Sequence, residues 1–515
     1  MSLQTRTGNM ELLGKIKAAR LLGAIGQVTQ FFGLVIEANG PDVFLGERCY
    51  IRGLENEPDL PVEVIGVRGG KVLLMPFEEP RGIRKGSEVY GTGEAVRIPV
   101  GDELLGRVID PFGRPLDDKG ALHVSAYQAL GAEPLNPLQR QPIQRILETG
   151  VRAIDSFLTI GRGQRVGIFS GSGVGKSTLL GMIARNVSAD VNVIALIGER
   201  GREVPDFIRN SLGESGMKRS VVVAATSDQS ALMRSYAAFA ATAIAESFRD
   251  RGRDVLLTMD SITRFAMARR EIGLAAGEPP TARGYTPSVF AMLPKLLERA
   301  GASASGASIT ALYTVLVEGD DMNEPVADHV RSIVDGHIVL SRKLAHEAHF
   351  PAIDVLQSNS RLANGLRTEE QSRVVQSAQR LISLYRESKD MLDLGAYQAG
   401  ANAELDRAIA LTPKIRQFLC QRESERVTAA QAFAALGALL TGAEPAVNAG
   451  AGAGPWVRGA SATATAAVNT GARATNSTWA SSGAGASSGI GPSGGAVAGI
   501  GAGNGAGAST GTRAG

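Results

Sequence analysis

The sequence predicts an α/β protein whose central parallel sheet follows a small β-barrel and precedes a helical domain. Between about residues 150 and 365, five short apolar runs alternate with helix-forming stretches, as buried parallel strands do. Before that region, short alternating segments are separated by glycine turns, and after it no strand signal remains. We therefore expect five parts, at residues 1–22, 23–98, 99–366, 367–440 and 441–515.

The first part, residues 1–22, is predicted to form a short amphipathic helix. Its apolar residues recur at helical spacing and basic residues take the other face. The apolar set is Leu12, Leu13, Ile16 and Ala19, and the basic set is Lys15, Lys17 and Arg20. The pattern leaves open whether this helix packs on its own barrel or binds a partner.

The barrel prediction for residues 23–98 depends on alternation and turns. Val62, Val64 and Val67 alternate before Gly69-Gly70, and the apolar run Val72–Met75 follows, as in a β-hairpin. Several strands at such spacing predict a small β-barrel.

The strands of the central sheet are expected at five apolar runs. Strands that are buried on both faces have continuous apolar sequences rather than an alternation. The runs are Val166–Phe169, Val193–Ile197, Val221–Ala224, Val255–Met259 and Ile309–Val317.

Composition separates the last two parts of the chain. Residues 367–440 are rich in helix formers and predict a small helical domain. Residues 441–515 are mostly Gly, Ala, Ser and Thr, which cannot bury enough apolar surface to fold, so we expect a disordered tail. Trp456 and Trp479 lie in this tail, where we interpret them as incidental rather than as docking points.

The chain as a whole is close to electrical balance, with 54 Lys and Arg against 51 Asp and Glu over 515 residues. The net charge of +3 gives no indication of bulk nucleic-acid binding. Cys49 and Cys420 have no metal-ligand spacing and fit packing roles in a reducing compartment. Because the sequence has no signal-peptide pattern and no long apolar run, we expect a cytosolic protein, which leaves peripheral membrane attachment open.

The most informative stretch is Ser170–Ser177, which reads SGSGVGKS and joins the run ending at Phe169 to an expected helix. A glycine-rich turn between a strand and a helix lets backbone N–H groups enclose phosphate oxygens, and the helix N-terminus adds its dipole. Lys176 would contact the outer phosphates and the Ser177 hydroxyl would hold Mg²⁺. Ser170 stands where this motif usually has its first glycine.

Two carboxylates follow strands of the predicted sheet. Asp260 closes the fourth apolar run, where it would serve Mg²⁺ in the nucleotide crevice or else cap the following helix. Glu199 follows the second run beside Arg200 and Arg202. We expect these arginines to keep Glu199 ionised and suited to orient or deprotonate water, the alternative being a surface salt-bridge cluster.

Arg361 follows the last predicted strand, in Ser358-Asn359-Ser360-Arg361. The pattern alone leaves open whether it is a surface residue or reaches the nucleotide of a neighbouring subunit.

Together these stretches resemble the rotary-type hexameric ATPases, and most closely the type III protein-export ATPases. The resemblance covers about residues 20–440 and implies a RecA-like ATPase domain, a barrel that forms a collar and C-terminal helices that meet cargo. Leu74–Glu79 is more similar to the flagellar branch than to the injectisome branch. The most specific segments are Gly171–Thr178, Gly198–Pro205, Asp260–Phe265, Gly277–Pro287, Leu296–Gly301 and Val317–Leu344.

The resemblance also implies a role for individual residues. ATP would be bound by Gly171, Ser172, Gly173, Val174, Gly175, Lys176, Ser177 and Thr178, with Phe350 stacked on adenine where the family often has tyrosine. Mg²⁺ would be held by Ser177 and Asp260. The catalytic residues would be Glu199 as the carboxylate, Lys176, Arg361 as the arginine finger and Arg200, with Arg264 as a further supporting arginine.

The implied function is Mg-dependent ATP hydrolysis by a homohexamer that energises type III export of flagellar proteins across the cytoplasmic membrane. The implied partners are identical subunits, a stator-like regulatory protein at residues 1–22, export-gate membrane proteins, export chaperones and flagellar cargo, without nucleic acid. The enzyme would be cytoplasmic and peripheral at that membrane.

Four other functions are compatible with parts of the pattern: an injectisome ATPase, a rotary ATP synthase subunit, a hexameric nucleic-acid translocase and a non-catalytic nucleotide-binding subunit. Acidic residues interspersed among the barrel aromatics count against the translocase. Glu199 counts against the non-catalytic subunit, in which the carboxylate is not needed.

Overall fold

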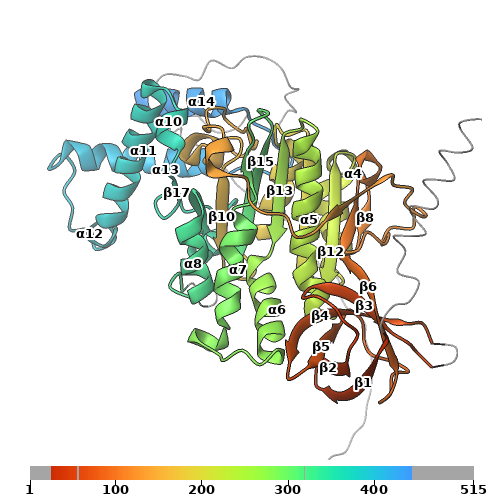
Figure 1. Cartoon of the computed structure of the whole chain (residues 1–515). Coiled ribbons are helices and arrows are strands. Elements are labelled where there is room, and N and C mark those ends of the chain that lie inside the picture. Colours follow the sequence, from red (N-terminus) through yellow and green to blue (C-terminus); the bar gives the residue numbers. More distant parts are fainter. Residues whose placement is uncertain (1–24, 55–56, 318, 320, 443–515) are drawn as a thin grey trace, which may run out of the picture. The chain divides into compact units, whose positions relative to one another are not determined.

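The computed structural model describes residues 25–54, 57–317, 319 and 321–442 (Figure 1). The predicted amphipathic helix of residues 1–22 lies outside the described residues. So does the predicted disordered tail with Trp456 and Trp479, apart from its first two residues.

Six strands form a closed barrel at the start of the described chain, in the order β1-β2-β5-β4-β3-β6. The interior holds one apolar cluster, which includes Val28, Ile51, Val64 and Leu74. The barrel and its Gly69-Gly70 hairpin between β4 and β5 confirm the prediction. The strands are β1 (Ile25–Phe32), β2 (Val35–Asn39), β3 (Glu47–Ile51), β4 (Leu60–Arg68), β5 (Lys71–Pro76) and β6 (Glu88–Ala95).

The central sheet has nine strands among the described residues, in the order β17-β16-β10-β15-β13-β11-β12-β8, with β14 paired to β15. Strands β10, β11, β12, β13 and β15 contain the five predicted apolar runs and pair in parallel. The predicted parallel sheet is thus confirmed, and the strands that sequence reasoning missed are β8, β14, β16 and β17. The strands are β8 (Val108–Ile109), β10 (Arg165–Ser170), β11 (Val191–Glu199), β12 (Ser220–Thr226), β13 (Val255–Asp260), β14 (Gly301–Ala302), β15 (Ser308–Leu316), β16 (Gly336–Leu340) and β17 (Asn359–Ser360).

Helices cover both faces of the sheet. Along β11, Val193, Ala195 and Ile197 join the apolar cluster that includes helices α5, α6 and α7. Ile194 and Leu196 join the other cluster, with α2 and the C-terminal helices, because successive side chains of a strand point to opposite faces. The helices on the two faces are α2 (Lys176–Asn186), α5 (Ala231–Asp250), α6 (Ile262–Ala275), α7 (Pro287–Leu297) and α8 (Pro325–Ile333), of which α8 also joins the first cluster.

Shorter elements connect these layers. A two-stranded sheet of β7 (Arg97–Val100) and β9 (Ala126–Ala129) lies in the connection from the barrel to the central sheet. The remaining short elements are η1 (Asp102–Leu104), η2 (Pro137–Gln139), η3 (Ala153–Leu158), α3 (Glu203–Asp206), η4 (Phe207–Leu212), α4 (Gly213–Met217), η5 (Ala282–Gly284), α9 (Arg342–His346) and α10 (Ala363–Leu366).

The predicted helical domain follows, with α11 (Glu369–Glu387), α12 (Lys389–Asp393), α13 (Ala403–Leu419) and α14 (Ala429–Thr441). Thr368 and Thr428 each begin a helix with a capping box, in which the threonine side chain accepts from a backbone N–H and a glutamine side chain returns the bond. In the described part of the chain, no helix combines the length and the apolar character that crossing a membrane requires.

Candidate functional site

The glycine-rich loop connects the end of β10 to the start of α2. Gly173 and Gly175 have φ angles of 77° and 89°, in the left-handed region that side chains with a Cβ disfavour. Ser170 is instead the last residue of β10 and pairs in register with Leu316 and Leu340. Since an extended residue does not need glycine, serine is tolerated at this position of the motif.

Three predicted site residues meet beside this loop: Lys176, Glu199 and Asp260. Glu199 ends β11 and Asp260 ends β13, and these strands are neighbours whose carboxyl ends share one edge of the sheet. The Lys176 ammonium donates to Asp260 Oδ1 and lies 3.6 Å from Glu199 Oε1. All three side chains are largely buried, with exposed fractions of 12%, 17% and 4% for lysine, glutamate and aspartate.

Thr314 supports this cluster and was missed by sequence reasoning. Its hydroxyl donates to Asp260 Oδ1 at 2.8 Å from the neighbouring strand β15. The only signal in the sequence was the pair of threonines, Thr310 and Thr314, inside the apolar run Ile309–Val317. The bond fixes the carboxylate that also holds Lys176.

The charge environment of Glu199 differs from the prediction. Burial, followed by the nearby charge of Asp260, raises the pKa of Glu199 to about 7, while Lys176 opposes this shift. The expectation that Arg200 and Arg202 keep Glu199 ionised was wrong, because Arg200 is 68% exposed and pairs with Glu203 at 3.6 Å. A carboxyl group with a pKa near neutrality is suited to accept a proton from water.

For Lys176, the neighbouring charges outweigh the effect of burial on the pKa. Burial alone would lower the pKa of Lys176, but the charges of Asp260 and Glu199 outweigh burial and raise it. The buried ammonium therefore stays charged, as a phosphate-binding lysine must.

Arg264 and Phe350 also lie near the loop and the end of β11. A Cβ built on Gly198 would be 3.1 Å from Arg264 Cβ, so the arginine stem packs on this glycine. A Cβ built on Gly175 would be 3.6 Å from the Phe350 ring, which is 46% exposed. The backbone N–H of Gln421 donates to the Phe350 carbonyl at 3.0 Å, which ties this segment to the helical domain.

Arg361 lies at the other end of the strands. It follows Ser360, which pairs with Gly336, and Gly336 pairs with Val166 at the start of β10. Val166 precedes Ser170 by four residues, so about 13 Å of strand separate this position from the loop. Arg361 lines a cavity of about 250 Å³ with Asp328 and His337, among others. The structure does not bring Arg361 to the loop of its own chain.

The donors at the loop suit Mg²⁺ in chemical type. Ser177, the second residue of α2, supplies a hydroxyl and Asp260 a carboxylate, and Mg²⁺ prefers such hard oxygen ligands completed by phosphate and water. Among the residues that the structure describes, no group of three or more His, Cys, Asp or Glu side chains could hold a metal by itself.

Family models match all three folded regions of the chain. Residues 28–93 match the β-barrel domain of the ATP synthase alpha/beta family, and residues 150–360 match its nucleotide-binding domain. Residues 367–438 match the C-terminal domain of the T3SS EscN ATPase.

Curated relatives match over most of their length. A flagellum-specific ATP synthase of Treponema pallidum is 54% identical over 81% of this chain and 93% of the relative. The flagellum-specific ATP synthase of Bacillus subtilis is 53% identical over 81% of this chain and 95% of the relative. A type 3 secretion system ATPase of Xanthomonas euvesicatoria is 49% identical over 77% of this chain and 89% of the relative. The chain belongs to the ATP synthase α/β family of ATPases, in its flagellum-specific and type 3 secretion branch.

Solved structures of the family agree with the fold. The assembled ATPase EscN from the type III secretion system of enteropathogenic E. coli is 46% identical, with a TM-score of 0.77 over 81% of this chain and all of that one. EscN in complex with its central stalk EscO has a TM-score of 0.75 at 45% identity, with the same coverage. The resemblance inferred from the sequence motifs is thus confirmed.

Proposed function

We propose that this ATPase assembles as a homohexamer and hydrolyses Mg·ATP to energise the export of flagellar proteins across the cytoplasmic membrane. The observation that carries the proposal is the cluster of Lys176, Glu199 and Asp260 beside the glycine-rich loop. It combines a phosphate-binding cation, a metal carboxylate and a base with a pKa near neutrality. A subunit that only binds nucleotide has no need for the last of these.

Each residue would act on ATP in a defined way. The backbone N–H groups of residues 171–178 and the Lys176 ammonium would hold the phosphates, and Phe350 would stack on adenine. Ser177 and Asp260 would hold Mg²⁺, which neutralises the charge that develops on the transferred phosphate. Glu199 would take a proton from the attacking water while Arg264 supports the γ-phosphate, and Arg200 would have to turn away from Glu203 to join it.

The position of Arg361 supports an oligomer in which neighbouring subunits complete one another's sites. Because the loop and Arg361 lie at opposite ends of the strands, one chain cannot supply both to one nucleotide. In a ring, a head-to-tail interface would place the Arg361 of one subunit against the loop of the next. The similarity of this chain to EscN, whose solved structure is that of an assembled ATPase, supports this arrangement.

The remaining assignments extend the same proposal. The boundaries between the five parts of the chain would lie at residues 22, 98, 366 and 440. A stator-like regulatory protein would bind the N-terminal segment, residues 1–22. Export-gate membrane proteins, export chaperones and flagellar cargo would be the other partners, and the enzyme would be cytoplasmic and peripheral at the membrane. The structure of EscN in complex with its central stalk EscO supports a stalk-type protein partner for the assembled ATPase.

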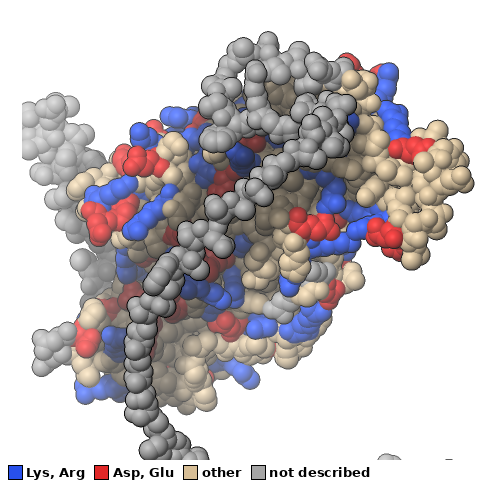
Figure 2. Space-filling model, turned by 180° about the vertical axis from the view of Figure 1, so that it is seen from behind, with Lys and Arg blue, Asp and Glu red and all other residues tan. Residues whose placement is uncertain are grey.

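Surface charge supports protein export over nucleic-acid translocation. On the face shown in Figure 2, Lys and Arg are interspersed with Asp and Glu rather than gathered into a basic field. A translocase needs a continuous basic path for the phosphate backbone. The injectisome remains the nearer alternative, since relatives named type 3 secretion ATPase are 47–50% identical and flagellar ones 48–54%.

The test measures Mg·ATP turnover per subunit over a wide range of protein concentration, with Glu199→Gln alongside. We expect specific activity to rise with concentration, and Glu199→Gln to bind Mg·ATP without turnover. Equal turnover in that variant would exclude Glu199 as the base, and flat activity would exclude sites shared between subunits. Restored motility in a strain that lacks its flagellar export ATPase tests the export role, and restored injectisome secretion alone would favour the alternative.

A further inference from the structure

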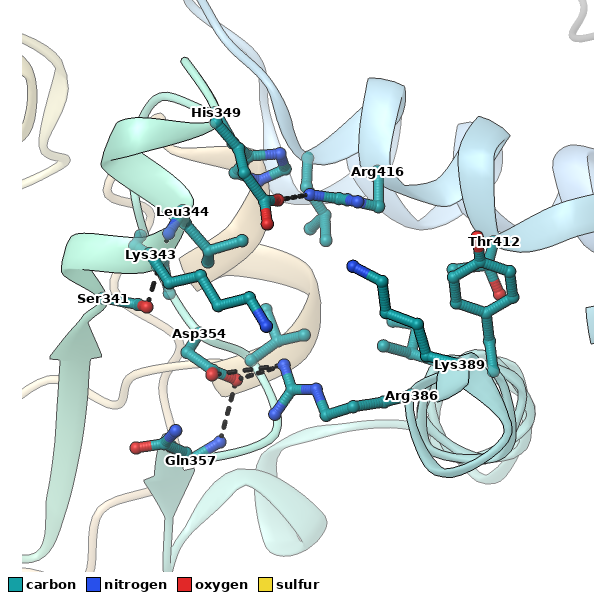
Figure 3. A pocket seen from close by; sticks show the side chains of 16 residues that line it. Ser341, Lys343, Leu344, His349, Asp354, Gln357, Arg386, Lys389, Thr412 and Arg416 are labelled. Atoms are coloured by element: carbon teal, nitrogen blue, oxygen red, sulfur yellow. Dashed lines mark hydrogen bonds and ion pairs between the residues drawn. The ribbon is translucent and has the colours of Figure 1, made fainter. Parts of the chain in front are cut away.

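A cavity of about 400 Å³ lies between the segment 341–357, which follows β16, and helices α11 and α13 of the helical domain (Figure 3). It is separate from the glycine-rich loop, none of whose residues line it. Its size is within the range of sites for small organic ligands.

The polar lining carries more positive than negative charge. Arg416 pairs with Glu347, and Arg386 pairs with Asp354 at 3.1 Å, so these four charges balance. Lys343 and Lys389 also line the cavity and form no ion pair within 4 Å among the residues that the structure describes, although both charges, with that of Arg416, help to lower the pKa of Glu347.

The two lysines come from opposite sides of the cavity. Lys343 belongs to α9 and Lys389 to the start of α12, and Figure 3 shows both side chains reaching into the same space. Two like charges that face a shared space repel each other, and an anion between them removes this repulsion. Arg386 and Arg416 extend the cationic side of the cavity and offer planar N–H groups that fit phosphate oxygens.

The rest of the lining is apolar and aromatic. Leu344, Ile353, Val355, Ile382 and Leu419 line the cavity together with the ring of Tyr385. A site with an apolar wall and a few convergent charges favours a small organic anion over a bare ion.

The same segment connects the cavity to the nucleotide site. His349 lines the cavity, and the next residue, Phe350, places its ring beside Gly175 of the loop. The Cys420 thiol lies 3.3 Å from His349 Nδ1, and the Gln421 N–H donates to the Phe350 carbonyl. A ligand that bridges Lys343 and Lys389 would therefore restrain the segment that positions Phe350.

We propose that this cavity is an effector site for a small phosphorylated anion, distinct from the ATP site, whose occupancy changes the affinity for ATP. The binding site itself does not depend on the export role. Its effect on ATP affinity rests on Phe350 stacking against adenine.

The test is calorimetric titration of the full chain with its loop first saturated by Mg²⁺ and a non-hydrolysable ATP analogue. The two probes are inorganic tripolyphosphate and a nucleoside 3′,5′-bisphosphate. We expect one equivalent to bind per chain, and the Kd to rise at least about tenfold in Lys343→Gln/Lys389→Gln. Tighter binding of the bisphosphate would identify a nucleotide-like ligand, and equal binding would identify phosphate charge alone as the determinant.

Lys414→Gln is the matched control, because Lys414 is exposed on α13 but does not line the cavity. It should leave the Kd unchanged. The proposal is overturned if neither probe binds, if all three proteins bind alike, or if an acidic peptide binds at the two lysines more tightly than either probe. In separate steady-state assays of ATP hydrolysis, the KM for ATP should differ between the protein with bound probe and the protein without it. An unchanged KM would overturn the effector role.

Discussion

Two inactive variants of this ATPase should restore activity when their subunits mix. Lys176→Ala removes the ammonium proposed to bind phosphate, and Arg361→Ala removes the proposed arginine finger, which lies about 13 Å of strand away from the loop of its own chain. If each site combines the loop of one subunit with the Arg361 of the next, a mixed interface can hold an intact copy of both. In a random one-to-one mixture, one half of the loops and one half of the fingers are intact, so about a quarter of the interfaces are complete.

The assay uses the two variants with different tags, co-expressed and purified through both tags in turn. Each variant alone should show background turnover of Mg·ATP, and the mixed assembly roughly a quarter of the wild-type rate per subunit. Lys176→Ala chains that carry both tags are the control for contaminating activity. If mixed assemblies bind nucleotide but stay at background, Arg361 does not complete a neighbouring site and the reasoning from strand register is refuted.

Three further predictions follow from the site and the core. Since burial and Asp260 raise the pKa of Glu199 to about 7 and the base must be deprotonated, kcat/KM should fall about tenfold per pH unit below that value; a flat profile from pH 5.5 to 7 would contradict this. Phe350→Ala should raise the KM for ATP about tenfold with little change in kcat, whereas Phe350→Tyr should not, as steady-state kinetics would show. Arg299 donates to both Glu246 carboxylate oxygens at 2.8 and 2.6 Å in the core. Arg299→Leu leaves a buried unpaired carboxylate, so it should lower the free energy of unfolding by about 3–5 kcal/mol and lower the Tm in calorimetry. The double variant Arg299→Leu/Glu246→Leu should recover most of that loss. An unchanged Tm in Arg299→Leu would show that the buried pair is not needed.

The loop and its carboxylates were predictable because local sequence determines them. A strand, a glycine turn and a helix are adjacent in sequence, and the carboxyl ends of parallel strands meet at one edge of the sheet. Asp260 and Glu199 each end a strand, so a parallel sheet places them at the same edge, whereas their contact also requires the strand order that makes β11 and β13 neighbours.

The position of Arg361 and the pKa of Glu199 required the structure. Arg361 is placed by the antiparallel pairing of β16 with the two-residue edge strand β17, which is too short to have a sequence pattern of its own. The charges that act on Glu199 come from Asp260 and Lys176, which are distant in sequence, whereas Arg200, its neighbour in sequence, is turned toward solvent. Adjacency in sequence was a poor guide to the electrostatics of a buried side chain.

The proposed dependence of hydrolysis on assembly rests on the pairing of Lys176 and on the position of Arg361. Lys176 is neutralised by Asp260 and lies close to Glu199, so the buried cation is compensated within one chain. A bound phosphate would draw the ammonium away from these carboxylates, which would leave Asp260 available to hold Mg²⁺ and Glu199 to accept a proton from water. If the proposed finger comes from the other end of a neighbouring sheet, hydrolysis should depend on assembly whereas nucleotide binding should not.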